Sequence, residues 1–170
     1  MSLTSGAPSA LMPPASLSAA VERLSHASTT EDIIGIVRGC ARGLIGSDGI
    51  ALVMRDGDHC HYVEEDAIGP LWRGRRFPMA SCISGWSMLH RQTVAISDIF
   101  LDQRIPHDLY RATFVRSLVM APIRRADPVG ALGAYWKQAY EPNLAEVETV
   151  EALAEAAAAA LKKLPDVPRK

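Results

Sequence analysis

The spacing of apolar positions predicts helices at both ends of this chain. In the first, over Leu17–Leu24, residues Leu17, Ala20, Val21 and Leu24 repeat at helical spacing. A second helix is expected after Thr29 or Thr30, because either hydroxyl can accept a hydrogen bond from the first free backbone amides. Its apolar face would be made of Ile33, Ile34, Val37, Ala41 and Leu44.

Glycines interrupt the second helix at every fourth position. Gly35, Gly39 and Gly43 lower its intrinsic helical propensity. We expect these glycines to let the helix pack closely against a sheet.

Short apolar runs bounded by turn residues predict six strands between the helices. The turn signal Asp56-Gly57 joins the first two into a hairpin, and Asp127-Pro128 joins the last two. Ser81 is expected to cap a short helix, and a second short helix is compatible with the residues after Pro106. The predicted strands cover residues 49–54, 59–65, 72–77, 93–97, 117–123 and 131–137.

The segment Asn143–Leu164 predicts the longest helix. Asn143 and Glu146 have the spacing of a capping box, and alanine dominates the interior. Two apolar stripes run along it, one of which has the spacing of a coiled-coil seam. The seam predicts a homodimer through Leu17–Leu24 and Asn143–Leu164, and the alternative is that the whole face packs on the chain's own sheet. The seam positions are Val147, Val150, Ala154, Ala157, Leu161 and Leu164, and the second stripe is Leu153, Ala156 and Ala160.

Together these elements predict an α+β fold in which helices cover one face of an antiparallel sheet. The domain is expected to span residues 16–164, after a disordered lead-in over 1–15 and before a short tail over 165–170.

Composition narrows the classes of function. Because 18 basic residues nearly balance 19 acidic ones, no overall charge favours nucleic acid or an anionic membrane surface. The most apolar window, AEAAAAAL, is much shorter than the roughly 20 residues that span a bilayer, so no membrane span is expected. Cys40, Cys60 and Cys82 are odd in number and form no CxxC pair, which favours free thiols in the cytoplasm.

Five segments in order give the chain a family resemblance. They are SGWSMLHRQTVAISDI, DQRIP, TFVRSLVMAPI, VGALGAYW and EVETVEALAEAAAAAL, which lie between about Leu24 and Leu164. With them the chain resembles a GAF domain, of the type found as the sensory input module of bacterial histidine kinases. The resemblance implies a six-stranded antiparallel sheet with the terminal helices on one face. On the other face it implies a small-molecule pocket under a roof segment, residues 98–114.

The resemblance also implies where a ligand would bind. Gly85 is expected to let Trp86 turn toward the core, and Asp98 to start the roof. The alternative for Asp98 is a turn acid that accepts hydrogen bonds from the following backbone. The predicted ligand-binding residues are Trp86, Asp98, Tyr110, Arg111, Phe114, Met120 and Tyr135.

Arginines near this region could recognise a carboxylate or phosphate, or could form a solvated surface balanced by Glu64, Glu65 and Asp66. One group lies at a strand edge and the other flanks the roof. The residues are Arg73, Arg75, Arg76, Arg104, Arg111 and Arg116.

The same residues bear on metal, cofactor and redox sites. A strand places Cys60 on the face opposite to His59 and His61, which argues against a metal site. The roof has no cysteine for covalent bilin attachment, and neither haem nor a metal is expected. Cys82 precedes a helix whose amide dipoles lower a thiol pKa, but the roof offers no second cysteine for disulfide exchange.

These observations predict a noncatalytic sensory domain that binds a small molecule of unknown identity. Two alternatives remain. One is a structural dimerisation module whose pocket is filled by its own side chains. The other is a redox enzyme similar to the free methionine sulfoxide reductases.

Overall fold

The computed structural model of the chain describes residues 12–165. Most of the predicted lead-in over residues 1–15, and nearly all of the tail over 165–170, therefore lie outside the described residues. None of the helices in the described part of the chain is both long enough and apolar enough to cross a membrane.

Helices and strands follow one another in an order close to the predicted one. The helices are α1 (Leu17–Ser25), α2 (Thr30–Ile45), α3 (Ile83–His90), α4 (His107–Arg111) and α5 (Leu144–Lys163), and two 3₁₀ turns are η2 (Met79–Ser81) and η3 (Ile99–Leu101). The strands are β1 (Gly49–Asp56), β2 (His59–Ala67), β3 (Arg76–Pro78), β4 (Val94–Ile96), β5 (Ser117–Ile123) and β6 (Gly130–Trp136).

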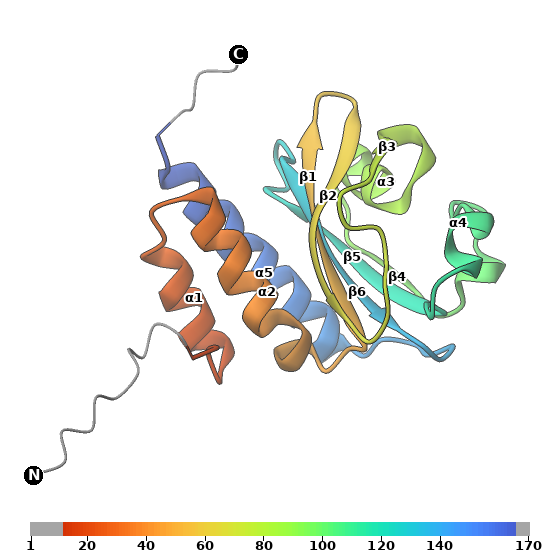
Figure 1. Cartoon of the computed structure of the whole chain (residues 1–170), viewed down its shortest axis with the longest axis horizontal. Coiled ribbons are helices and arrows are strands. Elements are labelled where there is room, and N and C mark those ends of the chain that lie inside the picture. The colour runs from red at the N-terminus through yellow and green to blue at the C-terminus, as the bar shows by residue number, and fades with distance from the viewer. Residues whose placement is uncertain (1–11, 166–170) are drawn as a thin grey trace, which may run out of the picture.

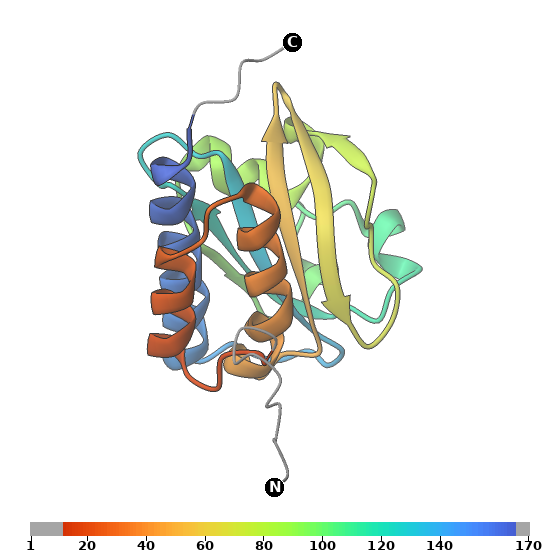
Figure 2. The same cartoon turned by 60° about the vertical axis from the view of Figure 1, so that its left-hand side comes forward.

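The strands form one antiparallel sheet of six in the order β3-β2-β1-β6-β5-β4. Helices α2 and α5 cover one face, with α1 packed on both of them, and α3 and α4 lie on the other side of the sheet (Figure 1; Figure 2). The predicted α+β class and the six-stranded sheet are confirmed. Strands β5 and β6, neither of which is at an edge, are buried along their whole length, because both of their faces are covered.

The core between the helices and the sheet contains the apolar faces predicted for α2 and α5. Thr29 caps α2 and forms a capping box with Asp32, and Asn143 does the same with Glu146 at α5, as predicted for the latter. Ile33, Val37 and Ala41 of α2 pack in this core together with Val150, Leu153, Ala154, Ala157 and Ala160 of α5.

The glycines of α2 do not face the sheet. A Cβ built on Gly35, Gly39 or Gly43 would meet nothing within 4 Å. The prediction that they allow close packing is therefore wrong. They occupy the outer side of the helix because the four-residue spacing places all three on the face opposite to the buried one.

Two local predictions about the segment before α3 are also wrong. The third strand begins at Arg76 rather than Trp72, because Gly74 adopts a left-handed conformation (φ 85°) that interrupts the extended chain. Ser81 ends η2, and the residue that caps α3 is Cys82, whose side chain makes no capping hydrogen bond.

A β-bulge in β2 decides which acids face which layer. Ladder pairing passes from Leu52 with Glu64 to Val53 with Tyr62, so Val63 is the extra residue. As a result, Glu64 reaches Arg38 on α2 (3.6 Å), whereas the next residue, Glu65, is buried on the opposite face.

Candidate functional site

The face of the sheet away from the long helices carries a second, separate apolar cluster. It is covered by η2, α3, the roof segment and the connection that follows β2. The implied arrangement of a sheet with a roofed second face is therefore present. This roofed face is the candidate functional site.

Trp72 lies at the centre of the roofed face, in the connection between β2 and β3. Its ring centroid is 4.7 Å from that of Tyr110, 5.6 Å from that of Tyr62 and 5.8 Å from that of Tyr135. These four residues are each at most 3% exposed. We call them the aromatic cluster.

A buried carboxylate holds Trp72 in place. The two oxygens of Glu65 accept hydrogen bonds from the backbone amides of Leu71 (2.9 Å) and Arg73 (2.7 Å), on either side of Trp72. The Arg73 guanidinium also donates to the Glu65 carbonyl oxygen (2.8 Å). The carboxylate therefore folds the connection over the sheet and directs the indole into the cluster.

One hydroxyl of the cluster has no partner. The Tyr135 hydroxyl is fully buried and makes no hydrogen bond with any described residue. It lies over β6, 2.6 Å from the point where a Cβ on Gly133 would stand, so the missing side chain of Gly133 provides its space. Burial, followed by the nearby Tyr110, raises the pKa of Tyr135 well above its ordinary value, so the phenol stays neutral.

Three of the seven predicted ligand-binding residues belong to the buried roofed face: Tyr110, Met120 and Tyr135. Phe114 is partly buried and packs on it from the end of the sheet, where its ring would contact a Cβ on Gly49 at 2.9 Å. The structure thus brings these four residues to one face.

Trp86 also packs against the apolar cluster of the roofed face. It is half-buried, stacked on His90 of its own helix (4.2 Å between centroids), with the Arg104 guanidinium 4.4 Å above its ring. A Cβ on Gly85 would stand 1.9 Å from the carbonyl oxygen of Met79. The glycine allows η2 and α3 to touch.

Asp98 and Arg111 lie outside the aromatic cluster. One oxygen of Asp98 accepts a hydrogen bond from the Phe100 amide (3.1 Å), and the other pairs with Arg116 (3.2 Å). The turn-acid alternative for Asp98 is thereby confirmed. Arg111 is exposed and pairs with Asp108. Ligand contacts of both residues stay predictions.

The arginines considered for anion binding are mostly paired with carboxylates. Arg73 pairs with Glu64 (2.6 Å), as the solvated-surface alternative expected, and Arg76 pairs with Asp56 (3.1 Å). In the roof, Arg104 pairs with Asp102 at 2.6 Å. These pairs favour the solvated surface over an anion site.

Two cysteines meet on the roofed face. The sulfur atoms of Cys60 on β2 and Cys82 at the start of α3 are 3.2 Å apart, and both residues are buried as free thiols. Cys82 therefore has a second cysteine beside it, which comes from β2 and not from the roof, where none was expected. The side chain of Cys60 points away from those of His59 and His61, as predicted. Within residues 12–165 no group of three or more His, Cys, Asp and Glu residues is placed to hold a metal ion.

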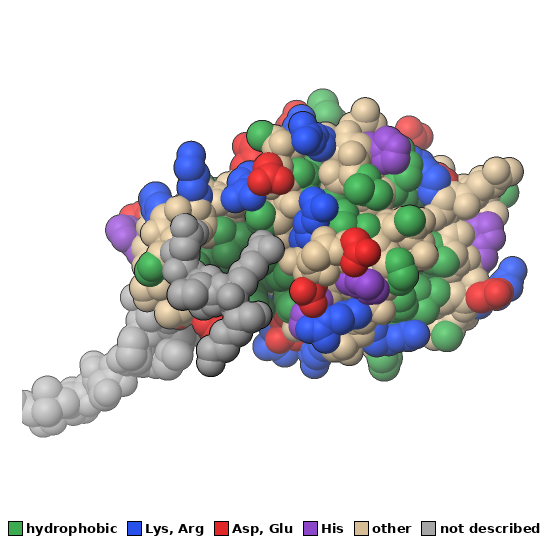
Figure 3. Space-filling model, turned by 90° about the horizontal axis from the view of Figure 1, so that it is seen from above, with side chains coloured by type: hydrophobic (Ala, Val, Ile, Leu, Met, Phe, Trp, Pro, Cys, Tyr) green, Lys and Arg blue, Asp and Glu red, His purple; other side chains and the backbone are tan. Residues whose placement is uncertain are grey.

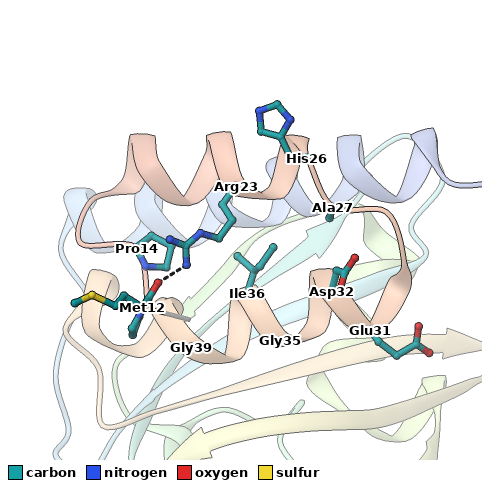
Figure 4. Close-up of a pocket in the computed structure, with 11 residues that line it drawn as sticks. Met12, Pro14, Arg23, His26, Ala27, Glu31, Asp32, Gly35, Ile36 and Gly39 are labelled. Atoms are coloured by element: carbon teal, nitrogen blue, oxygen red, sulfur yellow. Dashed lines mark hydrogen bonds between the residues drawn. The ribbon is translucent and has the colours of Figure 1, made fainter. Parts of the chain in front are cut away.

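Open cavities occur elsewhere on the molecule. A groove of about 450 Å³ lies between α1 and α2, where Arg23 reaches the backbone carbonyl of Met12 and Gly35 and Gly39 form part of the wall (Figure 4). A hollow of about 680 Å³ lies between the β1–β2 turn and the β5–β6 turn. None of the seven predicted residues lines either cavity.

Charges are mixed on the face seen in Figure 3, where basic and acidic side chains are interspersed among apolar ones. This distribution agrees with the near-zero net charge of the chain. It gives that face no single sign of charge.

The sheet order, the helical layer and the roofed second face define a class of small sensory and ligand-binding domains. Residues 27–162 match the family model of the GAF domain. The chain therefore belongs to the GAF family, a signalling and ligand-binding fold. No curated protein matches its sequence.

Solved structures show the same fold at low identity. A GAF domain from an Acinetobacter phosphoenolpyruvate-protein phosphotransferase is similar at a TM-score of 0.72 and 14% identity, over 86% of this chain and 90% of that one. Free methionine-R-sulfoxide reductase from Neisseria meningitidis, in complex with its substrate, has a TM-score of 0.73 and 13% identity, over 86% of each chain. Residues 122 to 287 of a methyl-accepting chemotaxis protein have a TM-score of 0.69 and 19% identity, over 85% of this chain and 95% of that one.

Sequence reasoning missed four residues that shape the site: Cys60, Tyr62, Glu65 and Trp72. The alternation of β2 could have placed Cys60 and Tyr62 on one face. Plain alternation puts Glu65 on the face opposite to Tyr62, and nothing in the residues marks the bulge at Val63 that brings both to the same face.

Proposed function

We propose that this chain is a noncatalytic sensory module of bacterial signal transduction, which acts in the cytoplasm on an output domain such as a histidine kinase. It binds a small molecule under the roof segment. Family membership supports this proposal, as does the similarity to part of a methyl-accepting chemotaxis protein.

The Tyr135 hydroxyl is the observation that carries the proposal. A buried hydroxyl without a partner costs about 1–3 kcal/mol, which a ligand with one hydrogen-bonding group would recover. The surrounding walls are aromatic and apolar. We therefore propose a compact, largely apolar ligand that places one polar group against Tyr135.

Entry of a ligand requires the aromatic cluster to open. Trp72 and Tyr110 fill the space in this structure, so the ligand would select a conformation in which the roof has moved. Tyr140 connects the start of the roof with α5. Its amide donates to the carbonyl oxygen of Ser97, the residue before the roof. Its hydroxyl donates to Glu146 of the α5 capping box (2.7 Å). Movement of the roof would reach the terminal helix by this route.

Native mass spectrometry of freshly purified protein tests the proposal. We expect the wild type to retain a noncovalent mass, and Tyr135→Phe to retain about tenfold less, because a hydrogen bond to the ligand is lost. Tyr140→Phe is the matched control and keeps the mass, since Tyr140 lies outside the cluster. The proposal is refuted if the folded wild type carries no mass and no fraction of a metabolite extract raises its melting temperature.

The close packing of Trp72 on Tyr110 favours the second candidate, a structural dimerisation module with a self-filled pocket. In that case Tyr135→Phe would stabilise the protein slightly, because it removes an unsatisfied hydroxyl, and no ligand would be found.

The contact between Cys60 and Cys82 favours the third candidate, an enzyme similar to free methionine sulfoxide reductase. An assay of the reduction of free methionine sulfoxide tests this candidate, which requires the wild type to be active. A Cys82→Ser variant with full reductase activity would exclude Cys82 from that mechanism.

A further inference from the structure

Cys60 and Cys82 come from elements that are distant in sequence and adjacent in space. Cys60 lies within β2, where it is paired with Arg55 of β1 and Phe77 of β3, and Cys82 immediately precedes α3. Their sulfur atoms are 3.2 Å apart, which is a nonbonded contact close enough for a hydrogen bond between the thiols.

We propose that Cys60 and Cys82 form a peroxide-reactive dithiol site, in which Cys82 attacks a small hydroperoxide and Cys60 then closes an intrachain disulfide. This activity is distinct from ligand binding by the aromatic cluster and does not depend on it.

The surroundings of the two sulfurs assign the roles. The Cys82 thiol donates to the Cys60 sulfur (3.2 Å) and to the Pro78 carbonyl oxygen (3.6 Å). Once Cys82 is ionised, the Cys60 thiol and the Ser84 hydroxyl (3.3 Å) can donate to it instead, together with the amides at the start of α3. The hydrogen bond from Cys60 lowers the pKa of Cys82, whereas the same contact and burial raise the pKa of Cys60. Of the two thiols, Cys82 is therefore the one that these contacts favour for ionisation to the nucleophilic thiolate.

Solvent exposure also favours Cys82 as the sulfur that meets the peroxide. Cys82 keeps 6% of its surface exposed and Cys60 keeps none. Only a small oxidant can reach a sulfur that is covered to this extent, so the substrate class is hydrogen peroxide or a small alkyl hydroperoxide. Bulky disulfides such as oxidised glutathione are excluded by size.

The chemistry balances in two steps. The Cys82 thiolate attacks the terminal peroxide oxygen, an S–O bond forms, the O–O bond breaks, and the departing alkoxide or hydroxide takes a proton from water; the sulfur loses two electrons and the peroxide gains them. Cys60 then attacks the sulfur of the Cys82 sulfenic acid. The S–S bond forms, the S–O bond breaks, and the hydroxyl leaves as water with the proton of Cys60.

Oxidation of Cys60 and Cys82 to a disulfide would change the position of a residue in the aromatic cluster. A disulfide draws the sulfurs to about 2 Å, so β2 and the start of α3 must approach one another. Ser84 bonds both Cys82 and the Tyr62 hydroxyl (3.0 Å), and the contact of Gly85 with Met79 leaves α3 little freedom to adjust alone. The oxidised pair would therefore shift Tyr62, one wall of the cluster.

Hydrogen peroxide itself is the probe for the test. The reduced full-length protein is treated with an equimolar amount at neutral pH, quenched, denatured and alkylated, and its thiols are counted by intact mass and nonreducing peptide mapping. We expect two of the three thiols to be lost, a Cys60–Cys82 crosslink, and a free Cys40. Cys40 is buried in the other core, where burial raises its pKa to about 11, so it serves as an internal control.

Variants separate the two roles. Cys82→Ser should react at least about tenfold more slowly, because the thiolate is gone. Cys60→Ser should react at Cys82 but stop at the sulfenic or sulfinic acid, and Cys40→Ser should behave like the wild type. The proposal is overturned if the wild type keeps three thiols, if the crosslink involves Cys40, or if Cys82→Ser reacts as fast as the wild type. The wild-type peptide map decides even if a variant fails to fold.

Discussion

Consecutive acids on β2 have opposite roles. Glu65 is buried and bonds two backbone amides around Trp72, whereas Glu64 faces Arg73 and Arg38 at the surface. We expect Glu65→Gln to lower the free energy of unfolding by about 1–3 kcal/mol, because the amide group sets an N–H donor against a backbone donor. Urea unfolding followed by tryptophan fluorescence measures this.

Glu64→Gln is the matched control for that experiment. It removes exposed ion pairs, and a change within about 1 kcal/mol is expected. Equal effects of the two substitutions would show that Glu65 does not hold the Trp72 connection.

The family resemblance predicted part of this site. Tyr110, Met120 and Tyr135 were predicted because they fall on positions that the resemblance implies or face the enclosed side of the expected sheet, and all three lie on the roofed face. The roles of Glu65 and Trp72 could not be predicted from the sequence, because their positions depend on the bulge at Val63 and on contacts between segments. The contact of Cys60 with Cys82 depends on the packing of α3 on β2, which no local pattern contains.

At the scale of the element, α2 contains glycines that lower its helical stability, although no neighbouring group requires the missing side chains. A Cβ on Gly43 would meet open space, and Gly43 lies outside the groove between α1 and α2. We expect Gly43→Ala to raise the free energy of unfolding by about 0.5–1 kcal/mol, because alanine loses less backbone entropy in a helix. Chemical denaturation monitored by circular dichroism tests it.

The same substitution in α3 should have the opposite sign. In Gly85→Ala the new Cβ would stand 1.9 Å from the Met79 carbonyl oxygen, so η2 and α3 must separate. A Gly85→Ala protein as stable as the wild type would contradict the close approach of these two elements.

The bounds of helices and strands were predictable where a capping or turn motif marks the end of the element. The capping box at Asn143 fixed the start of α5, and Asp56-Gly57 fixed the β1–β2 hairpin, where Gly57 has φ 62°. The third strand was misplaced because RGRR carries no alternation, and the turn at Gly74 is set by the anchoring of the neighbouring backbone to Glu65.

At the scale of the whole molecule, the long helices α2 and α5 bury most of their apolar side chains against the chain's own sheet. Val150, Ala154 and Ala157, three positions of the predicted seam, are buried in the helix-side core. The alternative of a face packed on the chain's own sheet accounts for them. A homodimer through α1 and α5 would have to use the outer surface of this layer.

We propose that this outer surface includes Val21, which is 39% exposed on α1. Two copies related by a twofold axis would each bury it, and a buried carboxylate there would be costly. We therefore expect the wild type to sediment as a dimer at micromolar concentration and Val21→Glu as a monomer with an unchanged circular dichroism spectrum. Leu101→Glu, at an 84% exposed position in the roof, is the control and should remain dimeric. A monomeric wild type, or loss of the dimer in both variants, would rule out this interface, and signals would then have to leave the domain through α5 without the help of a second copy.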